Sequence, residues 1–445
     1  MKTKYMALLL LLVCLLSLPL LAMAGPDVLV IGDTSVWSLM AHDFPVIGDN
    51  WVFDGEVLTL TNCTINTAYP YKTDYIRLGS GHEFINYISG LYFGEGDLTI
   101  KLVGENTIIT ADIMPTLNGG GIFAVDGIVC EDGSKLTIIG DGSLTVKTAS
   151  WKYHGTEFSR GILVDSLVIG NGKDIPTVTV QAGDLGSDYY YGASLSVGAD
   201  LRTLTMNSGI VNLMAGTAAN SINYTTYGLK IAGHSAVKKG VLRVVGGQEN
   251  SGVAVYCPDD VYALLNLYDC AFIAENPENG LAASQHGWFI WANHVHHRWR
   301  HGADDYWRPY EKPNDEYFCS QEGRTFNDFA ARLEYQAATT VSFKANGGSG
   351  TMDALSVFAG ETATLPECGF TAPAGKEFSH WELNGVALQP GATFDVTGPM
   401  TFTAVWKATS APAVPATGDG TNLLLLSALA LMSIGAFLAL RRRTA

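Results

Sequence analysis

Between residues 48 and 260 the sequence repeats itself, and this repetition restricts the fold more than any other feature. The segment LTIKLVGENTI, which starts at Leu98, aligns with LTIIGDGSLTV, which starts at Leu136, after a shift of 38 residues. A glycine followed by an aliphatic residue also recurs, at spacings of 37, 34, 31, 36 and 24 residues. Such loose periodicity is typical of a solenoid whose coils stack on one another. The repeated steps are Gly90-Leu91, Gly127-Ile128, Gly161-Ile162, Gly192-Ala193, Gly228-Leu229 and Gly252-Val253.

The residues that follow these steps alternate between apolar and polar, which indicates β-strands. We expect Leu98, Ile100, Leu136 and Ile138 to point inward as ladders of like side chains, with the Thr and Lys residues between them pointing outward. A propeller would need tighter periodicity, and a β-sandwich has no need for self-similarity. The sequence therefore predicts an all-β chain in which residues 25–338 form a right-handed parallel β-helix.

The N-terminal 24 residues have the order of a secretory signal peptide. Lys2 and Lys4 precede an apolar stretch, and small residues surround the expected cleavage site between Ala24 and Gly25. The alternative is a permanent N-terminal anchor. Leu18-Pro19 speaks against it, because proline interrupts the helix where a stable membrane span would continue.

The C-terminal residues 414–445 have the order of an anchoring segment. Eighteen predominantly apolar residues, 423–440, are long enough to cross a hydrocarbon core as a transmembrane helix, and three arginines follow them. The pentapeptide Val414-Pro415-Ala416-Thr417-Gly418 stands before this span. Taken alone, span and arginines would predict a plain membrane anchor.

Pentapeptide, span and basic end together closely resemble the LPXTG sorting signal of Gram-positive surface proteins, with Val414 in place of the usual leucine. The resemblance implies that a sortase cuts between Thr417 and Gly418 and joins the threonine carbonyl to a peptidoglycan amine. It also implies a protein that is attached to the membrane only before sorting. Sortase and peptidoglycan are then partners, and residues 25–417 lie outside the cell.

Residues 339–408 read as a separate small β unit, followed by a Pro/Ala linker at 409–413. The unit resembles the internalin B-type (Listeria–Bacteroides) repeat in VSFKANGG from Val341, in GKEFSHWE from Gly375 and in TAVWK from Thr403. That resemblance implies a β-grasp module that serves as a stalk or interaction unit. Trp381 and Trp406 stand at alternating positions, where core packing is favoured over binding.

The larger region resembles secreted bacterial β-helix proteins that are described as carbohydrate-binding. The resemblance rests on WVFDGEVLTLTNCTI from Trp51, on the aligned pair of repeats and on the glycine-aliphatic steps. It covers most of residues 48–260 and is more specific for the fold than for a ligand.

A cluster of aromatic residues and histidines at 286–310 is the strongest candidate for a binding site. One interpretation is a cap, at about 275–338, that closes the end of the solenoid. A second is a sugar platform, because indoles cover the apolar face of a pyranose while arginines bind its hydroxyls. The ligand-binding candidates are Trp288, Trp291, Trp299, Trp307, Arg298 and Arg300.

Other chemistry in the sequence has weaker support. A metal site at His294 and His296 with Asp304 or Asp305 lacks a fixed-spacing motif, so we expect no bound metal there. The pairs Asp259-Asp260 and Asp304-Asp305 are the best candidates for catalysis, but neighbouring strand residues point to opposite faces. We expect no cofactor, apart from weak calcium binding by acidic loops. The net charge of −16 disfavours nucleic acid as a partner.

Six cysteines remain after removal of the signal peptide, and an even number outside the cell permits disulfides. Cys63 and Cys130 lie in alternating strands, where we expect unpaired burial. The spacing of Cys257 and Cys270 makes them the best local pair. The state of Cys257, Cys270, Cys319 and Cys368 stays open.

The sequence thus predicts a cell-wall-anchored surface protein that binds a glycan or a host surface protein without catalysis. The alternative is a β-helix polysaccharide hydrolase or lyase.

Overall fold

The computed structural model describes an all-β chain, as the sequence predicted. Every regular element in the described residues is a strand, and none is a helix. Contacts divide the chain between Thr339 and Thr340 into two units, one residue beyond the expected boundary. The described residues are 28–37, 44–78, 81–94, 96–110, 122–130, 133–150, 157–186, 194–219, 224–247, 252–256, 263–275, 282–283, 288–292, 296–301, 308–310, 315–319 and 332–409.

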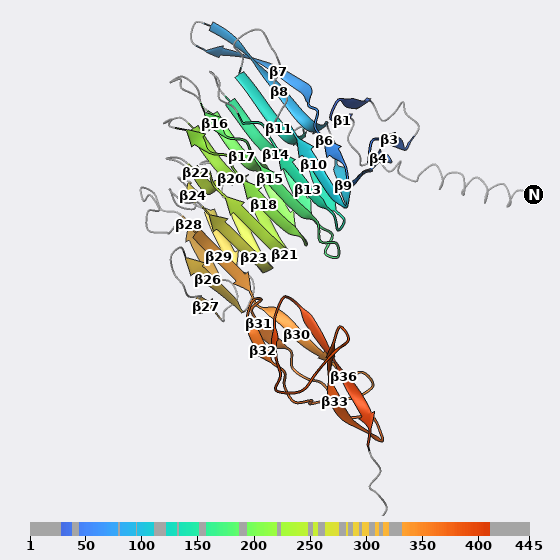
Figure 1. Ribbon diagram of the computed structural model, residues 1–445. Helices are drawn as coiled ribbons and strands as arrows, with labels where there is room; N and C mark the ends of the chain where they lie inside the picture. The colour runs from blue at the N-terminus through green and yellow to red at the C-terminus, as the bar shows by residue number, and fades with distance from the viewer. Residues whose placement is uncertain are drawn as a thin grey trace, which may run out of the picture. The chain divides into compact units, whose positions relative to one another are not determined.

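The first unit is a β-solenoid whose successive coils pair in parallel (Figure 1). What we call the first ladder consists of β8 (Gly81–Phe93), β11 (Ile122–Cys130), β14 (Glu157–Ile169), β17 (Ser194–Met206), β20 (Tyr224–Ile231), β22 (Gly252–Tyr256) and β24 (Ala282–Ala283).

Two further ladders complete each coil. The second ladder contains β5 (Val57–Thr61), β9 (Leu98–Val103), β12 (Lys135–Ile139), the last residues of β14 and β17, the first residues of β21 (His234–Val245) and β23 (Leu264–Glu275), and β25 (Trp288–Ala292). The third ladder contains β6 (Thr64–Ile65), β10 (Glu105–Ile109), β13 (Ser143–Lys147), β15 (Thr177–Gln181), β18 (Ile210–Met214) and the last residues of β21 and β23. A short parallel pair, β16 (Leu185–Gly186) and β19 (Ala218–Ala219), lies beside them.

The aliphatic repeats form the core of the solenoid. Leu98 pairs with Leu136 and Ile100 with Ile138, which is the 38-residue shift read from the sequence. All four side chains are fully buried, while Lys101 on the same strand is exposed. The prediction of inward ladders of like side chains is therefore confirmed for these strands.

The glycine-aliphatic steps also stack in register, with one correction. Ile162 pairs with Ala199, so the fourth step is Gly198-Ala199 and not Gly192-Ala193, which lies outside the described residues. The last predicted step, Gly252-Val253, is also displaced, because Leu229 pairs with Val255 and not with Val253. The glycines that occupy the column are Gly90, Gly127, Gly161, Gly198 and Gly228.

The column requires glycine because the third ladder passes close behind it. A Cβ on Gly161 would lie 2.0 Å from Val180 Cγ1 and 2.5 Å from the Gly198 carbonyl oxygen. A Cβ on Gly127 would meet Val146 and the Gly161 carbonyl in the same way. Absence of a side chain thus lets the first and third ladders approach at this corner.

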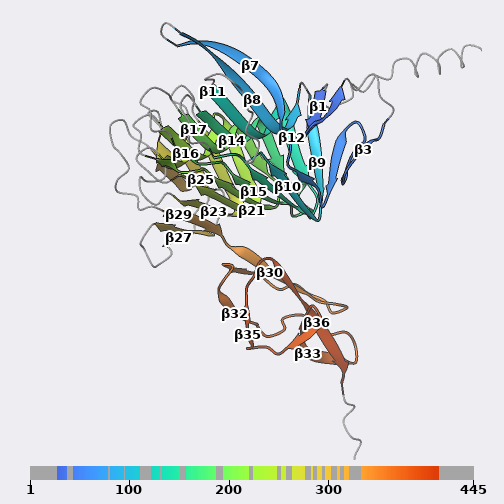
Figure 2. The same cartoon turned by 45° about the horizontal axis from the view of Figure 1, so that its top comes forward.

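Antiparallel strands adjoin both ends of the solenoid (Figure 2). At the start, β1 (Val28–Ile31) pairs with β2 (Thr34–Trp37) and β8, β3 (Val46–Gly48) and β4 (Trp51–Phe53) extend from β5, and β7 (Tyr69–Leu78) pairs with β8. At the other end, β29 (Arg332–Ala337) pairs with β23 and with β26 (His297–His301), β26 with β27 (Arg308–Tyr310), and β25 with β28 (Asp315–Cys319).

The second unit is built on a five-stranded sheet of order β31-β30-β36-β33-β34. Trp381 is fully buried in its core, as the sequence predicted, whereas Trp406 is half-buried and donates its indole N–H to the Ala345 carbonyl. The strands are β30 (Thr339–Lys344), β31 (Leu355–Val357), β33 (Lys376–Leu383), β34 (Val386–Leu388) and β36 (Met400–Ala408), with β32 (Thr362–Thr364) and β35 (Thr393–Asp395) forming a separate pair.

None of the cysteines whose side chains the structure describes forms a disulfide. Cys63 and Cys130 are buried without a disulfide, as predicted. Burial raises the pKa of the Cys130 thiol to about 11. Cys270 is also free and buried, so the disulfide with Cys257 that the spacing allowed is not formed. Cys368 is a free, half-buried thiol in the second unit, and the side chains of Cys257 and Cys319 lie outside the described residues.

The expected terminal signals also lie outside the described residues. These are the signal peptide with its Ala24-Gly25 cleavage site, most of the linker, the pentapeptide and the span at 423–440. In the part of the chain that the structure describes, no helix has the length and apolar character needed to cross a membrane.

Candidate functional site

Trp299, a candidate from the sequence, packs inside the end of the solenoid. Its side chain is 1% exposed, and its ring centroid lies 4.8 Å from that of Tyr335 on β29. The buried His297 ring meets the Trp299 ring edge-on at 6.2 Å. This is the packing that a cap needs, because antiparallel β29 covers the last strand of the third ladder. In this position Trp299 presents no indole face to a sugar.

The two arginine candidates bind across the same antiparallel strands. Arg298 is buried and donates from Nε and Nη2 to Gln336 Oε1 at 2.9 and 2.6 Å. Arg300 Nη2 lies 2.7 Å from Glu334 Oε1 in an ion pair that is partly exposed. Both guanidinium groups therefore join β26 to β29.

The side chains of most of the other predicted candidates lie outside the described residues. The backbone of Trp288 and Trp291 runs along β25 and pairs antiparallel with β28, but their side chains lie outside the described residues. Six further residues lie entirely outside the described residues: Trp307, His294, Asp259, Asp260, Asp304 and Asp305. Among described residues, no group of His, Cys, Asp or Glu is arranged to hold a metal ion.

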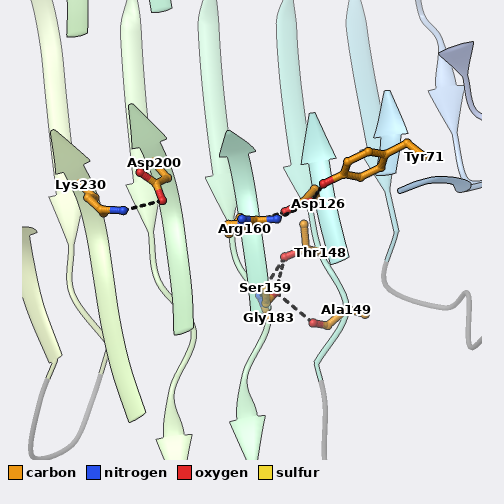
Figure 3. A network of polar contacts seen from close by, with 9 residues as sticks. All are labelled: Tyr71, Asp126, Thr148, Ala149, Ser159, Arg160, Gly183, Asp200 and Lys230. Carbon is orange, nitrogen blue, oxygen red and sulfur yellow. Dashed lines mark hydrogen bonds and ion pairs between the residues drawn. The ribbon is translucent and has the colours of Figure 1, made fainter. Parts of the chain in front are cut away.

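A polar network that the sequence analysis missed lies on the outer face of the first ladder, opposite the aliphatic core. Asp126 on β11 and Arg160 on β14 are paired across adjacent coils. Arg160 donates from Nε to Asp126 Oδ1 at 2.6 Å and from Nη2 to Oδ2 at 2.9 Å (Figure 3). This bidentate geometry is the strongest form of a carboxylate pair. The pair is sequestered, since Asp126 is fully buried and the Arg160 side chain is 13% exposed.

Tyr71 completes the coordination of Asp126. Its hydroxyl donates to Asp126 Oδ2 at 2.6 Å. The register of β7 and β8 shifts between Pro70 and Lys72, so Tyr71 is the extra residue of a β-bulge. Bulges redirect a side chain, and here the phenol is placed on the neighbouring coil. Its ring stacks on Tyr92 at 5.1 Å and 15°.

Burial and charge act together on this network. Burial raises the pKa of Tyr71 well above its ordinary value, and the adjacent Asp126 carboxylate raises it further. Burial disfavours the charged form of Arg160, but the carboxylate of Asp126 outweighs burial and raises the pKa of Arg160. Phenol and guanidinium are therefore both protonated at neutral pH, and both donate to one carboxylate.

Aromatic rings surround the cation. The guanidinium carbon of Arg160 lies 5.8 Å from the Tyr87 ring centroid and 5.7 Å from that of Phe158. These distances are within the range of cation–π attraction. The face thus carries a guanidinium flanked by two rings, with its charge balanced by Asp126.

A second ion pair and a second ring stack lie further along the same face. Lys230 Nζ on β20 lies 2.9 Å from Asp200 Oδ2 on β17. Tyr227 and Tyr256 stack almost parallel, with ring centroids 4.2 Å apart and an interplanar angle of 4°. We call the set Tyr71, Tyr87, Asp126, Phe158, Arg160, Asp200, Tyr227, Lys230 and Tyr256 the first-ladder face.

Buried hydroxyls support the strands behind this face. Ser159, the neighbour of Arg160, has its hydroxyl 2.6 Å from that of Thr148 and accepts a hydrogen bond from the Gly183 N–H at 2.9 Å (Figure 3). Ser196 repeats the arrangement one coil later and accepts from the Gly216 N–H at 2.9 Å. The hydroxyls join the third ladder to the first and fix the strand that carries Arg160.

Two features of the first-ladder face bear on its chemistry. Its stacked rings and fixed donors suit contact with a polyhydroxylated ligand. Its carboxylates are already bound, because Asp126 accepts three hydrogen bonds and Asp200 accepts one from Lys230. Glycoside hydrolysis needs one protonated acid and one available carboxylate, and neither Asp126 nor Asp200 is placed for that role.

Comparison with known proteins gives no further guide. No protein-family model, curated protein or solved structure matches this chain.

Proposed function

We propose that this chain is a surface protein, joined to the cell wall by a sortase, that binds glycans without catalysis through the first-ladder face. In this proposal the solenoid is a right-handed β-helix, and residues 339–408 form a β-grasp module between it and the wall anchor in the sequence. A host surface protein as ligand is the other candidate that the sequence left open.

The observation that carries the binding proposal is the combination of rings and polar groups on one face. The Tyr227-Tyr256 stack, in which Tyr227 is buried and Tyr256 half-buried, and the half-buried rings around Arg160 provide flat aromatic groups. The cross-coil pairs Asp126-Arg160 and Asp200-Lys230 hold polar groups beside these rings. Sugars are recognised by this pairing of aromatic faces with fixed hydrogen-bonding groups.

The proposal that this face is not catalytic is supported by its two carboxylates, which are both occupied by hydrogen bonds. Asp126 is fully buried and bound by both Tyr71 and Arg160. Asp200 is bound by Lys230. A hydrolase or lyase would need a carboxylate or base that is free to reach the glycosidic bond or an adjacent proton.

The localisation rests on the sequence. We propose export with cleavage between Ala24 and Gly25, followed by cleavage between Thr417 and Gly418 and attachment to peptidoglycan. The three terminal arginines and the span at 423–440 would hold the chain in the membrane until sorting.

The binding proposal is tested with the purified full-length chain on a glycan array. We expect Tyr256→Ala to weaken binding of the selected glycan about fivefold or more, since stacking on a ring is worth on the order of 1 kcal/mol or more. Tyr268→Ala is the matched control, because Tyr268 is an exposed tyrosine on β23 outside the first-ladder face. Equal loss in both variants, or none in either, would exclude this face as the binding site.

A further inference from the structure

Each cation on the first-ladder face has its own carboxylate. Arg160 is bound to Asp126 and Lys230 to Asp200, each across one coil boundary. The N–O distances of 2.6 and 2.9 Å are those of direct ion pairs. These two pairs therefore leave no net positive charge between them.

An anionic ligand could become the bidentate partner of Arg160 at Nε and Nη2 only by displacing Asp126 from a sequestered pair. Asp126 is fully buried, so removal of Arg160 would leave a carboxylate away from water whose remaining partner among the described side chains is the Tyr71 hydroxyl. Breaking such a pair is strongly unfavourable. A carboxylate or sulfate on a sugar cannot compete with a bidentate partner that is already in place.

A sugar hydroxyl can bind Arg160 without displacing Asp126. Arg160 uses Nε and Nη2 for Asp126, and Nη1 has no acceptor among the residues that the structure describes. One N–H donor next to two rings suits a sugar hydroxyl, which accepts a hydrogen bond without needing a net charge. The net charge of −16 over the whole chain adds a general repulsion of polyanions.

We infer that the ligand of the first-ladder face is a neutral glycan, without carboxylate, sulfate or phosphate groups, and that Asp126 and Asp200 set this preference by neutralising the two cations. The inference rests on the proposed glycan binding at this face.

The test compares the full-length chain on neutral oligosaccharides and on their carboxylated and sulfated forms, between about 50 and about 500 mM NaCl. We expect the neutral forms to bind at least about tenfold more tightly, with less than about a twofold change over the salt series. Asp200→Asn releases the partly exposed Lys230, and this variant should bind anionic forms about fivefold more tightly at low salt. Asp97→Asn is the matched control, because Asp97 pairs with Lys135 on the second ladder.

Each outcome decides a separate claim. Preferential binding of anionic forms by the wild-type chain, falling about tenfold or more with salt, would overturn the inference while glycan binding at this face stands. An Asp200→Asn variant that folds and matches the wild type on anionic forms would overturn the role given to charge pairing. Binding of neither class would remove both the inference and the proposed function. The wild-type salt series needs no variant, so misfolding of Asp200→Asn leaves that test in force.

Discussion

Tyr71 and Asp126 are 55 residues apart in the sequence, and the Tyr71 hydroxyl donates a hydrogen bond to Asp126 Oδ2 at 2.6 Å. The contact joins the β7–β8 hairpin to β11, which belongs to the next coil of the first ladder. Because Asp126 is fully buried, its oxygens depend on Tyr71 and Arg160 for hydrogen bonds.

Replacement of Tyr71 by phenylalanine should therefore lower stability. The ring and its stack on Tyr92 remain, and only the hydroxyl donor to a buried carboxylate is lost. We expect the free energy of unfolding to fall by about 1 to 3 kcal/mol, measured by denaturant titration. Tyr69→Phe on the same strand is the control, because its hydroxyl has no hydrogen-bond partner among described residues. Equal stability of the two variants would contradict a structural role for the Tyr71 hydroxyl.

The same contact predicts a pH dependence in the alkaline range. Burial, and then Asp126, raise the pKa of Tyr71 in the folded chain, so the unfolded chain loses this proton first, near pH 10. The contribution of Tyr71 to stability is complete below about pH 10 and is lost as the pH rises above it, by at most about 1.4 kcal/mol per pH unit. The measurement is the difference in unfolding free energy between wild type and Tyr71→Phe from about pH 8 to about pH 11. A difference that stays constant across this range would show that Tyr71 ionises normally in the folded chain.

The glycine column gives a steric prediction. A Cβ at residue 161 would lie 2.0 Å from Val180 Cγ1 and 2.5 Å from a backbone oxygen, and backbone cannot move aside cheaply. Gly161→Ala should therefore lower the free energy of unfolding by about 3 kcal/mol or more. Gly398→Ala is the control, since a Cβ there meets nothing within 4 Å. A Gly161→Ala variant as stable as this control would show that the two ladders can separate at no cost.

This column also shows how far the sequence predicted the fold. The steps at Gly90, Gly127, Gly161 and Gly228 were found from the repeat, since glycine next to an aliphatic residue is a strong local signal. The spacing of the repeat predicts Gly192 as the fourth step, although Gly198 occupies the column. Both glycines precede alanine, and coil length in a solenoid varies with its loops. Spacing alone could not choose between them.

The first-ladder face was missed for a related reason. Asp126 and Arg160 each stand directly before a glycine of the column, so alignment of the steps would have placed them side by side. The glycine steps in the sequence are therefore a signal for this pair. No such signal in the sequence indicates where the Tyr71 side chain lies, because its direction depends on a β-bulge that shifts the register of β7. The aromatic cluster at 286–310 is a candidate site by composition alone, and composition does not distinguish a buried indole from an exposed one.

Because Trp299 is buried, we expect it to stabilise the fold and not to contact a ligand. Trp299→Ala would leave a cavity against Tyr335 and the end of the core, and should lower the free energy of unfolding of the solenoid by about 3 to 5 kcal/mol. Trp381→Ala is the matched control, because it removes a fully buried indole from the second unit. It should leave the unfolding transition of the solenoid unchanged. A Trp299→Ala variant that stays stable and loses glycan affinity would instead assign Trp299 to a binding surface.

The anchoring proposal predicts a change of cell fraction when Thr417 is replaced by alanine. In the proposed reaction a sortase would cleave after Thr417 and join its carbonyl to peptidoglycan, so replacement of this residue is expected to impair sorting. The variant should therefore move from the wall fraction to the membrane or the medium, as detected by immunoblot after wall digestion. Ser410→Ala, a matched loss of a hydroxyl within the linker, should stay in the wall. Two results would contradict the proposal: Thr417→Ala that remains covalently bound to the wall, or a wild-type chain that detergent releases without wall digestion. The second would identify 423–440 as a permanent membrane anchor, because an apolar span of that length holds a protein in the bilayer unless it is cut away.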